Sequence, residues 1–245
     1  MASALTAKGA KVYGLARNAA ALKALQDKLG NMFVPAELDI TDQSAIAAWV
    51  EQTFSGQAAP DILINNAGAS YFSNTDALPL ERWHQMINTN LSGTFYMTAK
   101  IVPLMKEKTD ACHIINIGSI LGKTTNSESA AYSATKYGLQ CFSEALSKEL
   151  RGHKIKVTCL NPGSIATQFF EDSGVEPHRN MLQPDDVAAL VIHILETPDN
   201  LLVDELSLRP LIPDPPQTAP SPGPLARMVH KSGASGTRKK NTESI

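Results

Sequence analysis

The stretch His113-Ile114-Ile115-Asn116-Ile117 decides the fold class. Its isoleucines fall on both faces of an extended chain, so a strand here is apolar on both sides. Strands of this kind belong to parallel sheets that are covered by helices on both faces. Similar short runs occur at Lys11–Leu15, Met32–Val34, Asp61–Asn65 and Ile155–Leu160, with a weaker one at Val203–Leu208.

Longer segments with helical periodicity separate these runs. The patterns at Thr41-Asp42 and Gln183-Pro184 are typical helix starts, with a capping hydroxyl or a proline followed by acids. The alternation of strands and helices predicts an α/β fold with a doubly wound, Rossmann-like parallel sheet. The expected helices span Ala19–Leu29, Gln43–Phe54, Leu80–Lys106, Ala131–Leu150 and Pro184–Glu196.

The pattern indicates one domain over residues 1–210 and a different segment over residues 211–245. That segment holds six of the fifteen prolines and five basic residues against two acids, with little periodicity. We therefore expect a disordered, Pro-rich basic tail. Its triplet Arg238-Lys239-Lys240 could contact an anion, but a solvated charge run is the simpler interpretation.

Composition narrows the class of protein. A net charge of −2 gives no basic field for nucleic acid, and no apolar run approaches the roughly 18 residues of a membrane helix. The three cysteines, an odd number in apolar stretches, favour buried reduced thiols and hence a cytoplasmic protein. We assign no metal ligands.

Three side chains form the candidate catalytic group: Ser119, Tyr132 and Lys136. Tyr132 and Lys136 are four residues apart in a helical pattern, so they project from one face. An ammonium one turn from a phenol is expected to lower the pKa of the phenol, which would suit it to proton transfer with a carbonyl or an alcohol. Ser119 follows a strand at its carboxyl end, where such sheets bind ligands. Its hydroxyl could hold the same substrate oxygen.

The order of motifs resembles that of the short-chain dehydrogenase/reductase family. Ser119 precedes Tyr132 by the 13 residues usual in that family, and Tyr132-Ser133-Ala134-Thr135-Lys136 resembles its active-site core. Three further motifs occur in the family's order: Asn65-Asn66-Ala67-Gly68, Asn90-Leu91-Ser92-Gly93 and Asn161-Pro162-Gly163. The resemblance covers residues 4 to 210 and implies an oxidoreductase that exchanges hydride between NAD(P)(H) and a carbonyl or secondary alcohol.

The resemblance also implies a role for each matching residue. Tyr132 would be the general acid/base, Lys136 would lower its pKa and hold the nicotinamide ribose, and Ser119 would orient the substrate oxygen. Asn90 would anchor a water that relays protons from Lys136, although it could also be a helix-kink residue bonding its own backbone. Asn66 and Gly68 would line the adenosine side of the cofactor. The nicotinamide would be enclosed by Pro162, Gly163, Ile165 and Thr167.

Cofactor choice is expected to depend on the residues after the strand at Lys11–Leu15. NAD enzymes of this fold often carry an acid there, whereas an arginine accommodates the 2′-phosphate of NADP. This chain has Ala16-Arg17-Asn18, so Arg17 favours NADP, with NAD possible. By the resemblance, Asp39 would bond the adenine amino group.

One departure from the family concerns the start of the chain. The family opens with a strand and a loop of the type Thr-Gly-x-x-x-Gly-x-Gly, whose N–H groups bind the cofactor diphosphate. The segment Ala4–Ala10 instead matches the end of the helix that follows this loop. The sequence therefore predicts an N-terminally truncated member whose strands at Lys11–Leu15 and Asp61–Asn65 keep unpaired edges.

Two functions remain open from the sequence. The first is an active, NADP-preferring oxidoreductase. The second is a catalytically inactive remnant that acts as a binding or regulatory protein. The expected partners are a small carbonyl or alcohol and a second copy of the chain. A homodimer or homotetramer would form through the helices at Leu80–Lys106 and Ala131–Leu150, as the resemblance implies. The segment Gln168–Leu182 is expected to cover the substrate.

Overall fold

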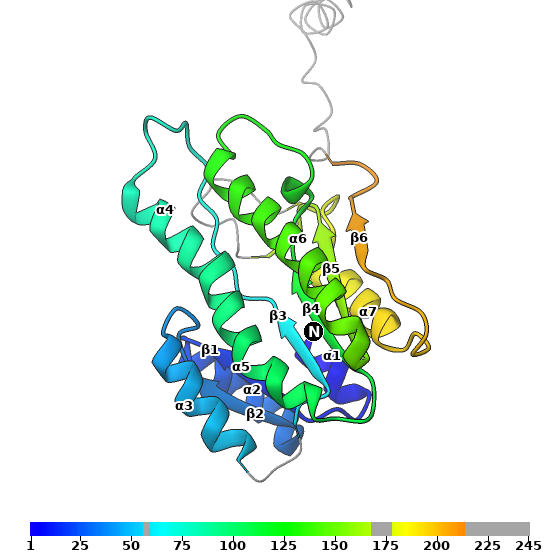
Figure 1. Cartoon of the computed structure of the whole chain (residues 1–245). Coiled ribbons are helices and arrows are strands. Elements are labelled where there is room, and N and C mark those ends of the chain that lie inside the picture. The colour runs from blue at the N-terminus through cyan, green and yellow to red at the C-terminus, as the bar shows by residue number, and fades with distance from the viewer. Residues whose placement is uncertain (56–58, 168–177, 214–245) are drawn as a thin grey trace, which may run out of the picture.

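The computed structural model describes residues 1–55, 59–167 and 178–213, and shows an α/β fold (Figure 1). Four parallel strands form one sheet in the order β3-β4-β5-β6. They span Ile62–Asn65, Cys112–Ile117, Ile155–Pro162 and Glu205–Leu208. A second parallel sheet pairs β1 (Val12–Ala16) with β2 (Phe33–Glu37).

The two sheets do not pair with each other within the described residues. Neither the free edge of β1 nor that of β3 has a strand partner there, and Ile62 of β3 is 37% exposed. This confirms the expectation that these two strands keep unpaired edges. Side-chain packing joins the sheets instead, since Tyr13 and Leu15 of β1 pack against the same apolar cluster as Leu63 of β3.

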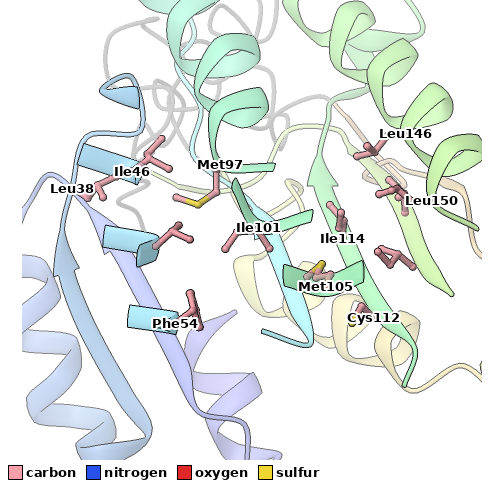
Figure 2. Close-up of a cluster of buried hydrophobic side chains, with 13 residues drawn as sticks. Leu38, Ile46, Phe54, Met97, Ile101, Met105, Cys112, Ile114, Leu146 and Leu150 are labelled. Atoms are coloured by element: carbon pink, nitrogen blue, oxygen red, sulfur yellow. The ribbon is translucent and has the colours of Figure 1, made fainter. Parts of the chain in front are cut away.

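Helices cover both faces of the larger sheet. On one face lie α5 (Thr94–Lys106) and the last turns of α6 (Ala130–Leu150). Together with α3 (Gln43–Phe54), which packs beside α5 next to the small sheet, they bury the cluster shown in Figure 2 against Ile114 of β4. On the other face α7 (Pro184–Leu195) packs on the next residue of the strand, Ile115. The consecutive residues Ile114 and Ile115 therefore pack against the helices on opposite faces of the sheet, as expected for a strand that is apolar on both sides.

The remaining helices complete the two layers. The short α1 (Ala2–Ala7) contacts both α7 and β1, and Met1 packs against the α7 cluster. The helix α2 (Ala19–Leu29) covers the small sheet, and the Asn18 side chain caps it by accepting from Ala21 N–H. In α3 the cap is the Asp42 carboxylate, which accepts from Ser44 and Ala45 N–H. The expected capping hydroxyl of Thr41 instead donates to Asp39.

The expected helix over Leu80–Lys106 is interrupted. It consists of α4 (Leu80–Ile87), a π-helical turn η2 (Asn88–Gly93) and α5. A Cβ atom added at Gly93 would lie 2.9 Å from the carbonyl oxygen of Ile40, so a side chain would not fit there. The wider turn brings Asn90 to the edge of the sheet where the candidate residues lie.

Within the described ranges, no helix combines the length and the apolar character that crossing a membrane requires. The predicted tail lies outside the described residues, except for residues 211–213.

Candidate active site

Helix α6 lies close to the carboxyl end of β4, and this contact brings the candidate residues together. The turn η3 (Ile120–Gly122) packs on α6 so tightly that a Cβ atom on Gly122 would lie 2.7 Å from the carbonyl oxygen of Lys136. Lys136 is 4% exposed, and its ammonium donates to the carbonyl oxygen of Ile117 at 2.8 Å. Tyr132, one turn earlier, is 5% exposed.

Ser119 follows β4 and is held through its backbone and its side chain. Its N–H donates to Asn161 Oδ1 at 3.1 Å, and its hydroxyl accepts from Leu121 N–H at 3.1 Å. A further hydrogen bond joins the side chains of Ser119 and Tyr132. The structure therefore brings Ser119, Tyr132 and Lys136 into one group, with the hydroxyl of Ser119 beside the phenol.

Burial shifts the pKa values of both α6 groups, in opposite directions. It raises the pKa of Tyr132 to about 12, although the hydrogen bond from Ser119 acts to lower it. Burial also lowers the pKa of Lys136 to about 8. The expectation that the pKa of the phenol would be lowered is wrong for this structure, because desolvation of the phenolate outweighs the contribution that lowers it. At neutral pH the phenol is protonated.

The Asn90 side chain connects the loop after β3 to α6 by hydrogen bonds. Its Oδ1 accepts from Ala69 N–H at 2.8 Å, and its Nδ2 donates to the Ala69 carbonyl at 2.9 Å and to Thr135 Oγ1 at 2.9 Å. The side chain is 1% exposed and bonds the loop after β3, not its own backbone. It thereby fixes that loop against α6, next to Tyr132 and Lys136.

A cavity of about 750 Å³ opens in front of these groups. Its lining includes Ser119, Tyr132, Lys136 and the predicted cofactor residues Asn66, Gly68, Pro162, Gly163, Ile165 and Thr167. The sequence reasoning missed several lining residues, among them Leu121, Asn126 and Ser164. It also missed Phe72, whose ring centroid lies 5.5 Å from that of Tyr132. They lie in the segments that follow the Asn66–Gly68, Ser119 and Pro162-Gly163 motifs, which was the available signal.

A second cavity of about 720 Å³ lies at the end of the small sheet. Arg17 and Asp39 line it, and Gly68 lines both cavities. The carboxylate of Asp39 accepts from the backbone N–H and the hydroxyl of Thr41, and the N–H bond is the main reason that its pKa is lowered. The Arg17 guanidinium lies 3.9 Å from Asp39, with 73% of its side chain exposed. Glu37 and Thr89 also line this cavity and were not predicted.

These two cavities suit the two ends of a dinucleotide. An exposed guanidinium and an oriented carboxylate can hold an anion and an amino group at one end. At the other end, the proton-carrying group lies beside a buried ammonium. Residues 168–177, most of the segment expected to cover the substrate, lie outside the described residues. The chain on either side is joined by a bridge between Ile165 and Leu182.

Comparison with known proteins shows the family. The sequence profile described as short chain dehydrogenase matches residues 1–177. An uncharacterized oxidoreductase of Staphylococcus aureus is 32% identical over 216 residues, which cover 86% of this chain and 91% of that protein.

Solved structures of the same family also match this chain. Serine dehydrogenase from Escherichia coli matches with a TM-score of 0.75 and 31% identity, covering 84% of this chain and 89% of its own. The closed form of serine dehydrogenase complexed with NADP+ matches with a TM-score of 0.78 and 30% identity, covering 84% and 88%. The chain belongs to the short-chain dehydrogenase family and is an oxidoreductase of that family.

The lowered pKa of Lys136 predicts a pH-dependent stability. Between its folded value of about 8 and the ordinary value of 10.5, the unfolded chain binds more protons at this lysine than the folded chain does. The contribution of Lys136 to the free energy of unfolding should therefore rise with pH, by up to about 1.4 kcal/mol per pH unit. Urea unfolding of the wild type and of Lys136→Met at pH 8.0 and 9.5 measures it as the difference between the two proteins.

The same comparison with Lys148→Met, an exposed lysine on α6, should give a difference that does not change with pH. A difference for Lys136→Met that is flat or falls with pH would contradict the burial of its ammonium.

Proposed function

We propose that this protein is an NADP-preferring oxidoreductase that acts on a ketone, an aldehyde or a secondary alcohol, with Tyr132 as general acid/base. The observation that carries the proposal is the grouping of Ser119, Tyr132 and Lys136 around one cavity. That cavity adjoins, at Gly68, a second one lined by Arg17 and Asp39. Membership of the family supports an active oxidoreductase and does not favour the alternative of an inactive remnant.

The protonation of the phenol suits Tyr132 to the role of general acid in carbonyl reduction. A group with a pKa of about 12 carries its proton at neutral pH, so it can give that proton to a carbonyl oxygen as negative charge develops there. Ser119, hydrogen-bonded to the same phenol, would hold the substrate oxygen in place. The buried ammonium of Lys136 would stabilise the phenolate that remains. The same groups would carry out alcohol oxidation in reverse, with a rate that rises with pH.

The bound cofactor would supply the hydride. This chain's residues would hold its two ends: Arg17 and Asp39 the adenosine end, with Asn66 and Gly68 beside them, and Lys136, Pro162, Gly163, Ile165 and Thr167 the nicotinamide end. The serine dehydrogenase match is a complex with NADP+, which supports the same cofactor here.

Substitution of Tyr132 tests the chemical step. Tyr132→Phe keeps the ring against Phe72 but removes the transferable proton, so turnover should fall by at least about 100-fold. The measurement is NADPH-dependent reduction of a panel of ketones and aldehydes, followed by absorbance. Tyr137→Phe, an exposed tyrosine on the same helix, is the control and should leave turnover unchanged. Near wild-type turnover in Tyr132→Phe would refute the assignment.

Cofactor preference tests the second cavity. Charge-assisted hydrogen bonds from Arg17 to the 2′-phosphate should contribute roughly 1.5–3 kcal/mol, so Arg17→Ala should weaken NADP about 10- to 150-fold and leave NAD nearly unchanged. Calorimetric titration with both cofactors gives the two dissociation constants. Arg151→Ala, an exposed arginine in the turn η4 (Arg151–His153), should change neither. Equal losses for the two cofactors in Arg17→Ala, or a wild-type preference for NAD, would count against the proposal.

We also propose that the chain forms a homodimer or homotetramer through α4, α5 and α6. In Figure 1 α4 and α5 follow each other end to end, and α6 lies alongside them. Exposed apolar side chains support this surface: Leu80 and Trp83 on α4, Phe95 on α5 and Tyr137 on α6. Phe95, 53% exposed, lies edge-on to Phe142 of α6 with ring centroids 6.4 Å apart. Burial against a second copy would remove this apolar area from water.

A charge on that surface should separate the subunits. Phe95→Asp is expected to lower the mass in solution to that of a monomer, because an unpaired carboxylate would be buried in the interface. Sedimentation velocity measures it. Leu201→Asp changes another exposed apolar side chain, outside these helices, and should leave the assembly intact. A wild type that is already monomeric would disprove the interface.

A further inference from the structure

A chain of hydrogen-bonded polar side chains connects Ser119 to residues that do not line the first cavity. It starts at the Ser119 N–H, which donates to Asn161 Oδ1 at 3.1 Å. Asn161 Nδ2 donates to Gln140 Oε1 at 2.8 Å, and Gln140 Nε2 donates to Glu205 Oε2 at 3.0 Å. The other oxygen of Glu205 pairs with the Lys123 ammonium. Four elements take part: the turn after β4, α6, β5 and β6.

The direction of these hydrogen bonds is fixed from one end. A carboxylate only accepts, so Glu205 requires the NH₂ group of Gln140 to face it. The carbonyl oxygen of Gln140 then faces Asn161 and requires the NH₂ group of that residue. The oxygen of Asn161 is left for the Ser119 N–H. A single charged group on β6 therefore sets the orientation of two amides and, through them, the acceptor that holds the backbone of Ser119.

The same chain of side chains holds both ends of the turn that bears Ser119. Ser119 precedes η3 and Lys123 follows it, so Asn161 binds one end and Glu205 the other. The Ser119 end of this turn is tightly packed. Asn161 is 0% exposed, and a Cβ atom on Gly118 would lie 2.0 Å from the Oδ1 atom of Asn161. A rotated amide would therefore displace the serine.

We infer that Gln140 and Glu205 are positioning residues for Ser119. Neither is among the residues that line either cavity, so neither touches the substrate in this arrangement. Gln140 lies one helical turn beyond Lys136 and two beyond Tyr132. The turn that bears Ser119 is therefore tied to the helix that carries the other two groups. This inference rests on the proposed oxidoreductase function.

The first test removes the polar link. Gln140→Leu has a similar size but no hydrogen-bonding groups, so the amide of Asn161 loses its fixed orientation. A displacement of about 1 Å at a reacting group can cost about 100-fold in rate, so kcat should fall 10- to 100-fold. The dissociation constant of NADP should stay within twofold. Lys8→Met is the control. It breaks an ion pair between Lys8 and Glu196, which are both exposed and outside this chain of side chains, and it should leave kcat unchanged.

The second test uses pH to restore the link. Gln140→Glu places a carboxyl group against Glu205, where two negative charges repel. When the pair holds one proton, the introduced carboxyl can donate to Glu205 and still accept from Asn161. The ratio of variant to wild-type kcat should therefore rise at least fivefold between pH 8 and pH 5.5. A residue that only supported the fold would give a ratio without this dependence.

The outcomes separate the two proposals. A kcat for Gln140→Leu within twofold of wild type overturns the positioning role, as does a pH-independent ratio for Gln140→Glu. A wild type that neither reduces a carbonyl nor oxidises a secondary alcohol overturns the proposed function instead. In that case the amide ¹H and ¹⁵N shifts of Ser119 still decide the positioning role. They should move in Gln140→Leu and not in Lys8→Met, and an unmoved signal in Gln140→Leu overturns it. If Gln140→Leu fails to fold, the pH dependence of the kcat ratio for Gln140→Glu still tests the positioning role.

Discussion

The buried ammonium of Lys136 is the constraint on which the rest of the site depends. An ammonium with 4% exposure has lost nearly all of its water, and the carbonyl oxygen of Ile117 replaces part of that hydration. This bond holds α6 at the end of β4, and the absent side chain of Gly122 permits the close approach. The depth of Tyr132 in the protein, its contact with Ser119 and the position of the cavity all follow from it.

The sequence predicted the elements well because their signals are local. The isoleucines around Ile114 and Ile115 predicted a strand covered on both faces, and the structure packs α3, α5 and α6 on one side and α7 on the other. The motif residues Ser119, Tyr132 and Lys136 were also predicted to meet, and they line one cavity. Hydrophobic patterning was sufficient for the strand, whereas the grouping of the three side chains was predicted from helical spacing together with the family resemblance.

Features that depend on burial could not be predicted in this way. The pKa of Tyr132 reflects how much water α6 and its neighbours exclude, which no spacing reveals, and the expected direction was wrong. The π-helical turn at Asn88–Gly93 interrupts a segment whose periodicity reads as one helix. Its cause is tertiary, since Asn90 bonds the loop at Ala69 and Gly93 lies against Ile40. Likewise, nothing near Gln140 in the sequence points to Glu205, 65 residues away.

The order of the strands determines which parts of the protein can unfold locally. In the larger sheet every neighbour along β3-β4-β5-β6 is also the next strand in the chain, and β4 and β5 are bonded on both sides. The small sheet β1-β2 is attached to it, in the described part of the chain, by packed side chains and not by a shared ladder. Amide protons of β4 and β5 should therefore exchange with solvent only when the whole domain unfolds. Those of β1 and β2 can exchange through a smaller, separate opening of lower free energy. The wall of the second cavity that carries Arg17 and Asp39 belongs to the unit that opens first.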